Sequence, residues 1–111
     1  LRLAEGAGRP ILVTENGIAT RNDGLRRDFL REHALVLAHR LEAGAPIEGY
    51  FYWSLIDNFE WLEGIRPRFG LFEVDYATFA RRRRPSADVF AQLGRRFTGE
   101  GGAGSSFAAR T

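Results

Sequence analysis

Two short apolar runs flank one long helical pattern in this chain. Residues 11–14 (Ile-Leu-Val-Thr) form a continuous apolar and β-branched run, which is typical of a strand buried on both faces. Residues 23–43 repeat leucine and other apolar side chains at helical spacing, and residues 47–54 form a second, aromatic run. Parallel strands require a crossover of about a dozen residues or more. The order strand, helix, strand therefore predicts a βαβ unit in an α/β protein.

The end of the first run has two interpretations. Glu15 is followed by Asn-Gly, and on those residues alone a two-residue hairpin turn is slightly favoured. However, Asn22 or Asp23 can cap a helix, and Gly44 follows its expected end. Because the chain after Gly17 enters a helix and does not return as a strand, we prefer the parallel arrangement. It puts Glu15 at the C-terminal end of a strand.

Residues 49–61 (Gly-Tyr-Phe-Tyr-Trp-Ser-Leu-Ile-Asp-Asn-Phe-Glu-Trp) join an aromatic strand to a carboxylate. Glu60 lies between Phe59 and Trp61, where a loop is expected to begin. Aromatic rings pack against the C–H faces of a sugar, and carboxylates accept hydrogen bonds from its hydroxyls. The stretch therefore indicates a sugar site. Taken alone, it is explained equally well by a buried amphipathic strand whose Tyr and Trp polar groups are satisfied internally.

Charge and composition exclude several function classes. All 16 basic residues are Arg, against 14 acids, and the formal net charge of +2 is too small to indicate nucleic-acid binding. We interpret the four Arg at 81–84 as a solvated loop, with a nucleic-acid patch or a localisation tag as alternatives. No apolar run approaches the roughly 20 residues of a membrane span, and no signal peptide is visible. We expect no membrane partner and a cytoplasmic location; the absence of cysteine permits a reducing compartment without requiring one.

The two histidines do not predict a metal site. His33 and His39 fall in the helical segment six residues apart, whereas ligands on one helical face need a spacing of three or four. We expect His33 to lie along the apolar stripe with a hydrogen-bond partner. His39 is expected near the helix C-terminus, where a positive charge is favourable. We therefore predict neither metal nor cofactor.

The rest of the chain predicts further elements. Partial alternation over 68–75 indicates a short half-buried strand, and 85–96 has the pattern of a last helix that begins with proline. Residues 98–111 are rich in Gly, Ala and Ser and are expected to form a disordered tail, which leaves 1–97 as the folded part. Residues 1–6 resemble the end of a helix, which indicates a piece of a longer protein.

Five motifs follow one another in an informative order. They are Ile-Leu-Val-Thr-Glu-Asn-Gly at 11–17, Asp-x-x-Arg-x-x-Phe-Leu-x-x-His at 23–33, the stretch at 49–61, Arg-Phe-Gly-Leu at 68–71 with Val-Asp-Tyr at 74–76, and Arg-Pro-Ser-Ala at 84–87. Together they resemble the C-terminal part of family 1 glycoside hydrolases, the β-glucosidase family. Thr-Glu-Asn-Gly alone is a weak signal. Followed at this distance by Tyr-Trp-Ser-Leu-x-Asp-Asn-Phe-Glu-Trp, it is highly specific.

The resemblance implies the C-terminal portion of a TIM (β/α)8 barrel, namely strands 7 and 8 with their helices in an incomplete barrel. Working residues of such barrels lie at the C-terminal ends of strands. By position in the family motifs, Glu15 is the catalytic nucleophile and Trp53 is the platform under the sugar ring. Glu60 and Trp61 hydrogen-bond the sugar hydroxyls, and Phe69 lines the same pocket.

The implied activity is that of a retaining β-glycosidase, which hydrolyses terminal unphosphorylated β-D-glycosides through a covalent intermediate on Glu15. Such an enzyme needs two carboxyl groups about 5 to 5.5 Å apart. The family's acid/base lies in a Thr-x-Asn-Glu-Pro motif that this sequence lacks, and Glu60 binds substrate in the family, so we expect the chain alone to be inactive. A non-catalytic sugar-binding homologue and a small independent structural domain are the rival interpretations.

Overall fold

The computed structural model describes residues 1–98 and 106–110. Its elements are α1 (Arg2–Glu5), β1 (Ile11–Asn16), α2 (Asp23–Glu42), β2 (Ile47–Trp53), β3 (Phe72–Val74), β4 (Arg81–Arg83), α3 (Pro85–Thr98) and β5 (Ser106–Arg110). β1 and β5 pair in parallel with the two edges of β2, and β3 pairs antiparallel with β4. Because α2 connects the parallel strands β1 and β2, the predicted βαβ unit is confirmed.

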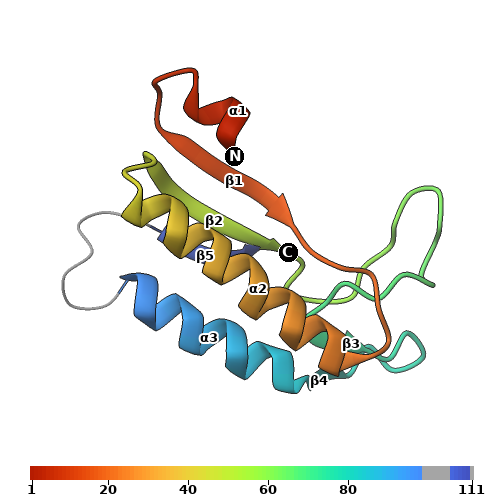
Figure 1. Ribbon diagram of the computed structural model, residues 1–111. Coiled ribbons are helices and arrows are strands. Elements are labelled where there is room, and N and C mark those ends of the chain that lie inside the picture. The colour runs from red at the N-terminus through yellow and green to blue at the C-terminus, as the bar shows by residue number, and fades with distance from the viewer. Residues whose placement is uncertain (99–105, 111) are drawn as a thin grey trace.

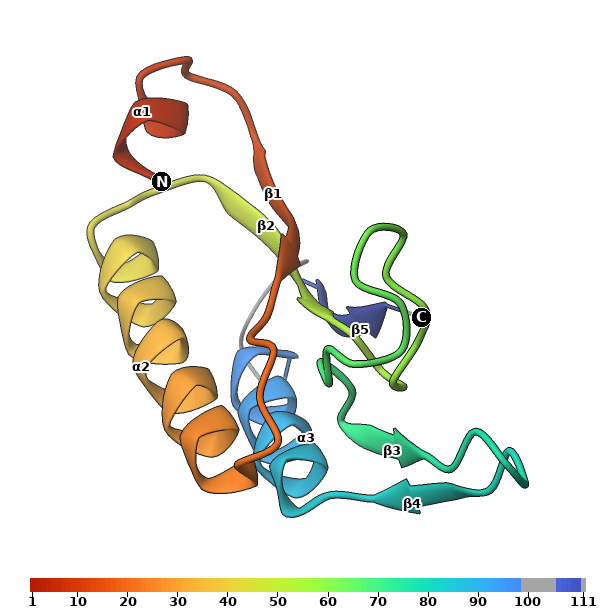
Figure 2. The same ribbon diagram turned by 90° about the vertical axis from the view of Figure 1, so that its right-hand side faces the viewer.

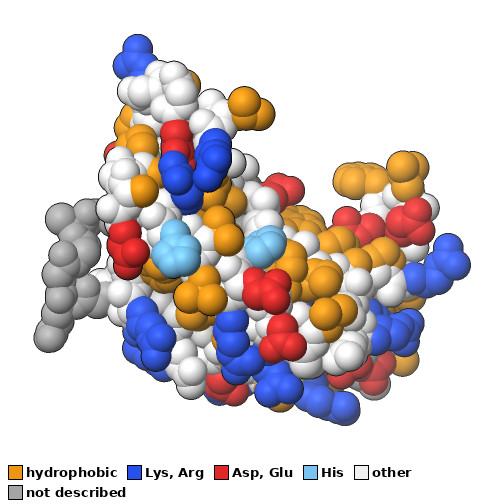
Figure 3. All heavy atoms as spheres, in the orientation of Figure 1, with side chains coloured by type: hydrophobic (Ala, Val, Ile, Leu, Met, Phe, Trp, Pro, Cys, Tyr) orange, Lys and Arg blue, Asp and Glu red, His pale blue; other side chains and the backbone are white. Residues whose placement is uncertain are grey.

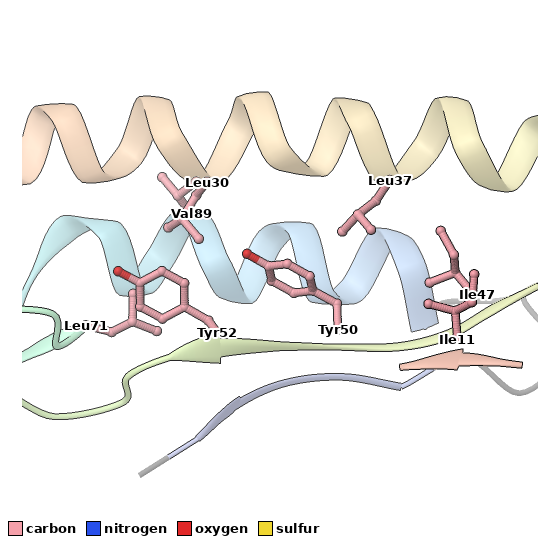
Figure 4. Close-up of a cluster of buried hydrophobic side chains, with 8 residues drawn as sticks. All are labelled: Ile11, Leu30, Leu37, Ile47, Tyr50, Tyr52, Leu71 and Val89. Carbon is pink, nitrogen blue, oxygen red and sulfur yellow. The ribbon is translucent and has the colours of Figure 1, made fainter. Parts of the chain in front are cut away.

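One face of the sheet is covered by helices. Figures 1 and 2 show α2 and α3 side by side on the same side of the sheet. The core between them and the strands consists of Ile11, Leu30, Leu37, Ile47, Tyr50, Tyr52, Leu71 and Val89 (Figure 4). Burying one such side chain contributes about 1.5–3 kcal/mol, so this layer supplies most of the apolar stabilisation. The opposite face of the sheet carries neither α2 nor α3.

The ends of α2 follow their sequence signals. Asn22 is the N-cap, and its side-chain oxygen accepts hydrogen bonds from the main-chain N–H groups of Gly24 at 2.9 Å and Leu25 at 3.3 Å. Gly44 has a φ of 84° just after the helix, a conformation that favours glycine. The cap contributes about 1 kcal/mol and fixes where the loop after β1 turns into α2. Within the described residues, no helix has both the length and the apolar character needed to cross a membrane.

The arginine run differs from the predicted solvated loop. Residues Arg81–Arg83 are exposed but form β4, the partner of β3 in a short hairpin. For Arg84 the predicted exposure is wrong. Its side chain is only 11% exposed, because it forms an ion pair with the buried carboxylate of Asp57. The strand expected over 68–75 is also shorter, since only Phe72–Val74 pairs with β4.

The C-terminal segment differs from the expected disordered tail at Ser106–Arg110. These residues form β5, which lies parallel to β2 with Ser106 opposite Gly49 and Arg110 opposite Trp53. Main-chain pairing with an open strand edge needs no large side chains, so the small-residue composition gave no sign of it. The remainder of the predicted tail, 99–105 and 111, lies outside the described residues.

Gly17 lies where the ends of β1 and β2 approach each other. A Cβ atom at position 17 would be 1.8 Å from the carbonyl oxygen of Trp53 and 2.8 Å from its carbonyl carbon. Backbone atoms cannot rotate away, so we expect Gly17→Ala to lower the free energy of unfolding by about 1–3 kcal/mol or more. Urea denaturation measures this. Gly6→Ala is the control, because its Cβ would meet only the Leu3 carbonyl oxygen at 3.4 Å; equal stability of both variants would contradict the prediction.

Candidate active site

The candidate residues gather at the C-terminal ends of β1 and β2. In the register of the two strands, Asn16 lies opposite Tyr52, and the main chain of Gly17 abuts that of Trp53. Both strands run in the same direction, so their C-terminal ends form one edge of the sheet. Glu15 and Trp53 therefore lie at the same edge on neighbouring strands.

The direction of the Glu15 side chain follows from its neighbour. Asn16 points to the helical layer, since its Oδ1 accepts a hydrogen bond from the Tyr50 hydroxyl at 2.8 Å and lies 2.5 Å from Nδ1 of His33. This contact confirms the hydrogen-bond partner predicted for His33, whose pKa is lowered by burial. Val13 also packs against this layer, and β1 is irregular between Val13 and Asn16, so the two residues between them, Thr14 and Glu15, are both exposed on the other face. The exposed carboxylate of Glu15 is therefore directed to the face without α2 and α3.

Trp53 is directed to the same face and meets Glu60. Its neighbour Tyr52 is fully buried toward the helices (Figure 4), where its hydroxyl donates to the carbonyl oxygen of Phe69 at 3.0 Å. Trp53 follows Tyr52 and so points to the opposite face. Its indole Nε1–H donates to Oε1 of Glu60 at 3.2 Å. An apolar ring and a carboxylate thus lie together on the face toward which Glu15 points.

Trp61 and Phe69 differ in how far they are exposed to solvent. Trp61 is 90% exposed, and its ring meets Phe59 edge-on, with ring centroids 6.3 Å apart. Figure 3 shows apolar side chains on the projecting loop that contains it. Phe69 is partly buried, and its carbonyl oxygen accepts hydrogen bonds from the Tyr52 hydroxyl and, at 3.5 Å, from the main-chain N–H of Ser54. The main chain of Phe69 is therefore fixed beside β2, whereas the indole of Trp61 is far less enclosed than that of Trp53.

Sequence reasoning missed a buried carboxylate beneath this loop. The side chain of Asp57 is 0% exposed, and its two oxygens accept hydrogen bonds from Nη1 and Nη2 of Arg84, each at 2.9 Å. Further donors are Nη1 of Arg68 at 3.2 Å and the main-chain N–H groups of Gly70 at 2.9 Å and Val74 at 3.4 Å. Burial opposes ionisation, but the Arg84 and main-chain hydrogen bonds outweigh it and hold the pKa of Asp57 below its usual value.

A second buried arginine joins the loops that follow β1 and β2. Arg26 is 0% exposed, and it donates to Oδ1 of Asp23 at 2.8 Å, to the carbonyl oxygen of Arg68 at 2.7 Å and to that of Thr20. Asp23 also accepts from the main-chain N–H of Ser86 at 2.9 Å and from its hydroxyl at 2.6 Å. The i,i+3 spacing of Asp23 and Arg26 signals a helical ion pair in the sequence, but it does not reveal the other partners.

The carboxyl groups of Asp23 and Asp57 are expected to make the protein less stable in acid. The pKa values of Asp23 and Asp57 are lowered from 3.8: burial opposes ionisation at both, and hydrogen bonds from Ser86 and Arg26 to Asp23 and from Arg84 to Asp57 outweigh it. Stability from a lowered carboxyl pKa is complete above the unfolded-state pKa and is lost as the pH falls through the folded-state value. We expect the free energy of unfolding, measured with urea, to decrease below about pH 4. Asp57→Asn should flatten that decrease; an equally steep profile in this variant would contradict the assignment.

Comparison with known proteins agrees with the motifs. The sequence model of glycosyl hydrolase family 1 matches residues 3–97. A β-galactosidase of Pyrococcus woesei is 44% identical over 87 residues, which are 78% of this chain and 17% of that protein. The β-glycosidase structure from Pyrococcus horikoshii superposes with a TM-score of 0.79 at 44% identity, over 90% of this chain and 26% of that chain.

A β-glucosidase of Thermotoga maritima, solved in complex with deoxynojirimycin, superposes with a TM-score of 0.76 at 35% identity. The superposition covers 82% of this chain and 23% of that chain. This chain therefore spans about a quarter or less of the length of the proteins it matches.

Proposed function

Because the chain belongs to glycosyl hydrolase family 1, we propose that it supplies the nucleophile and part of the sugar site of a retaining β-glycosidase. The reaction is hydrolysis of a terminal, unphosphorylated β-D-glycoside through a covalent glycosyl-enzyme intermediate. One observation carries this proposal. Glu15 and Trp53 lie at the C-terminal ends of neighbouring parallel strands and are directed to the same face of the sheet, and the Trp53 indole is bonded to Glu60 of the following loop.

Each residue has a role that fits its surroundings. The exposed carboxylate of Glu15 attacks the anomeric carbon, and water later releases the sugar from it. The indole of Trp53 takes the apolar face of the ring, and Glu60 accepts hydrogen bonds from hydroxyls, each contributing about 1.5–3 kcal/mol. Trp61 donates a further hydrogen bond to the sugar, and Phe69 lines the pocket. The negative charge of Glu60 repels phosphate, which favours an unphosphorylated sugar.

The proposed setting of these residues is a TIM barrel. In it, β1 and β2 are the seventh and eighth strands, α2 and α3 belong to the outer layer, and the face toward which Glu15 points is the interior. Barrel enzymes work at the C-terminal ends of their strands, which is the edge that carries Glu15 and Trp53. The acid/base motif Thr-x-Asn-Glu-Pro does not occur in the 111 residues, so we assign the second carboxyl group to another part of the barrel.

A non-catalytic sugar-binding homologue is the second candidate, because the Trp53–Glu60 pair binds sugar without needing a proton donor. The exposed carboxylate of Glu15 on the same face favours an enzyme over a binding protein, since binding alone does not require a nucleophile at that position. Trapping of a covalent sugar adduct on Glu15 distinguishes the two.

The 111-residue chain by itself is expected to be inactive. Without a proton donor at the glycosidic oxygen, the leaving group has to depart unassisted, and general acid catalysis typically supplies about 10²–10⁴-fold in rate. Release of the aryl alcohol from an aryl β-glucoside by the purified chain should therefore equal the buffer blank. Turnover well above the blank that disappears in Glu15→Gln would contradict the predicted inactivity.

A further inference from the structure

We propose that Asp57 is a positioning residue, which holds Glu60 against the indole of Trp53 through its ion pairs with Arg84 and Arg68. The inference rests on the proposed function, because Trp53 and Glu60 are the proposed sugar-binding pair. The arrangement of that pair can nevertheless be measured without a sugar, so it is tested independently of catalysis.

The segment that leads out of β2 is bonded along its length to the segment before β3. The main-chain bonds, from donor to acceptor, are Leu71 N to Ser54 O (3.0 Å), Phe72 N to Leu55 O (2.9 Å) and Asp57 N to Phe72 O (3.0 Å). No side chain fits between the two segments at Gly70, where a Cβ would lie 2.3 Å from the Asp57 nitrogen. Residues 54–57 therefore keep their position only as long as 69–72 keep theirs.

The carboxylate of Asp57 bonds to both segments' neighbours: it accepts from the Gly70 N–H and from Arg84, the residue before α3. Arg84 immediately precedes Pro85, the first residue of α3, and its main-chain N–H donates to the Leu71 carbonyl oxygen at 3.0 Å. Its guanidinium bridges both oxygens of Asp57 and the carbonyl oxygen of Gly70, the latter at 2.6 Å. A bidentate pair of this kind fixes orientation as well as distance. Asp57 is thus anchored to a helix that packs on the core.

Only two residues separate Asp57 from Glu60. Glu60 begins a tight turn, in which its N–H donates to the Gly64 carbonyl oxygen at 2.8 Å and its own carbonyl oxygen accepts from the Gly64 N–H at 2.7 Å. Three residue steps span at most about 11 Å, so the anchor at Asp57 restricts where this turn can lie. β2 fixes Trp53 at the other end. The 3.2 Å bond between the indole N–H and Glu60 therefore depends on Asp57.

Arg68 adds a second connection to the same carboxylate. Its Nη1 bonds both Asp57 and the Val74 carbonyl oxygen, at 3.2 and 3.1 Å, and its guanidinium lies 5.1 Å from the centre of the Tyr76 ring. Its own carbonyl oxygen accepts from Arg26. The same carbonyl oxygen accepts from the main-chain N–H of Thr20 at 3.0 Å, so Arg68 also connects Asp57 to the loop that follows Glu15.

The experiment follows the indole N–H signal of Trp53 by NMR in the 111-residue chain. The chain has two Trp residues, so Trp61→Phe leaves Trp53 as the single reporter. Glu60→Gln supplies the reference shift for a weakened bond. We expect Asp57→Asn to move the Trp53 signal in the same direction and to speed hydrogen exchange of the indole about tenfold, as for loss of one hydrogen bond to a charged group. The double variant Asp57→Asn/Glu60→Gln should add little to Glu60→Gln alone.

Further variants separate positioning from general stability. Arg84→Lys keeps the charge but loses the bidentate geometry, so it should reproduce part of the shift of the Trp53 signal. If Asp57→Asn fails to fold, this variant tests the proposal in its place. Arg40→Ala breaks the pair of Arg40 with Glu5, which lies in α1 away from the loop, and should leave the Trp53 signal unchanged. A wild-type Trp53 signal in folded Asp57→Asn or Arg84→Lys protein overturns the proposal, as does an unchanged signal in Glu60→Gln. None of these outcomes depends on Glu15 being the nucleophile.

Discussion

Replacing Glu15 with glutamine is expected to abolish formation of the glycosyl-enzyme intermediate, because a neutral amide cannot attack the anomeric carbon. Loss of a nucleophile that works as part of a catalytic unit lowers kcat on the order of 10⁴- to 10⁶-fold. The test uses a chimera in which residues 3–97 replace the matching segment of the Pyrococcus horikoshii β-glycosidase, which supplies the rest of the fold. A fluorinated glycoside that traps the intermediate should label the Glu15 peptide, as detected by mass spectrometry.

The control for this experiment is Glu48→Gln. Glu48 is exposed and lies near the start of β2, at the end of the sheet opposite to Glu15, so its loss should leave both labelling and turnover intact. An adduct that still accumulates in Glu15→Gln would refute the assignment of the nucleophile. Failure of the unaltered chimera to label, although folded, would favour the non-catalytic homologue.

Removing Arg84 is expected to cost far more stability than removing Arg82, although both belong to the same run of four arginines. Arg84 pairs at 2.9 Å with a carboxylate that is 0% exposed, whereas Arg82 lies 3.8 Å from Glu73 and is itself 86% exposed. Breaking a buried pair costs about 3–5 kcal/mol, because the remaining charge stays buried without its partner. An exposed pair contributes about 0–1 kcal/mol.

Urea denaturation followed by circular dichroism should therefore separate Arg84→Ala from Arg82→Ala clearly. Arg68 remains bonded to Asp57 in the first variant, which places its expected loss toward the lower end of the range for buried pairs. Similar midpoints for the two variants would mean that Asp57 is compensated without Arg84, and that the buried pair adds little to the fold.

Local sequence signals were sufficient for most elements of this fold. The helix predicted over 23–43 is α2, Asp23–Glu42, because its capping residues and apolar spacing act within a few neighbouring turns. The parallel order of β1 and β2 followed from the length of the crossover. The position of Glu15 at the end of β1 was predictable for the same reason.

Whether the candidate residues face one another was not decided locally. The pairing of β1 with β2 shifts in register between Val13 and Asn16, so simple alternation counted from the start of the strand does not give the direction of Glu15. The bonds of Asn16 to Tyr50 and His33, residues distant in sequence, and the packing of Val13 on the core place both flanking residues toward the helices, which leaves Glu15 on the other face.

The amino-acid sequence by itself determined β1, α2, β2 and α3, the family and the candidate site residues, because periodicity, caps and motifs are properties of neighbouring residues. Only the tertiary structure decided that Arg84 is buried while Arg82 is solvated, and that Ser106–Arg110 pairs with β2. Four adjacent arginines are chemically identical in sequence. Their difference arises from Asp57, 27 residues away, because a charge removed from water requires a partner at that point in space.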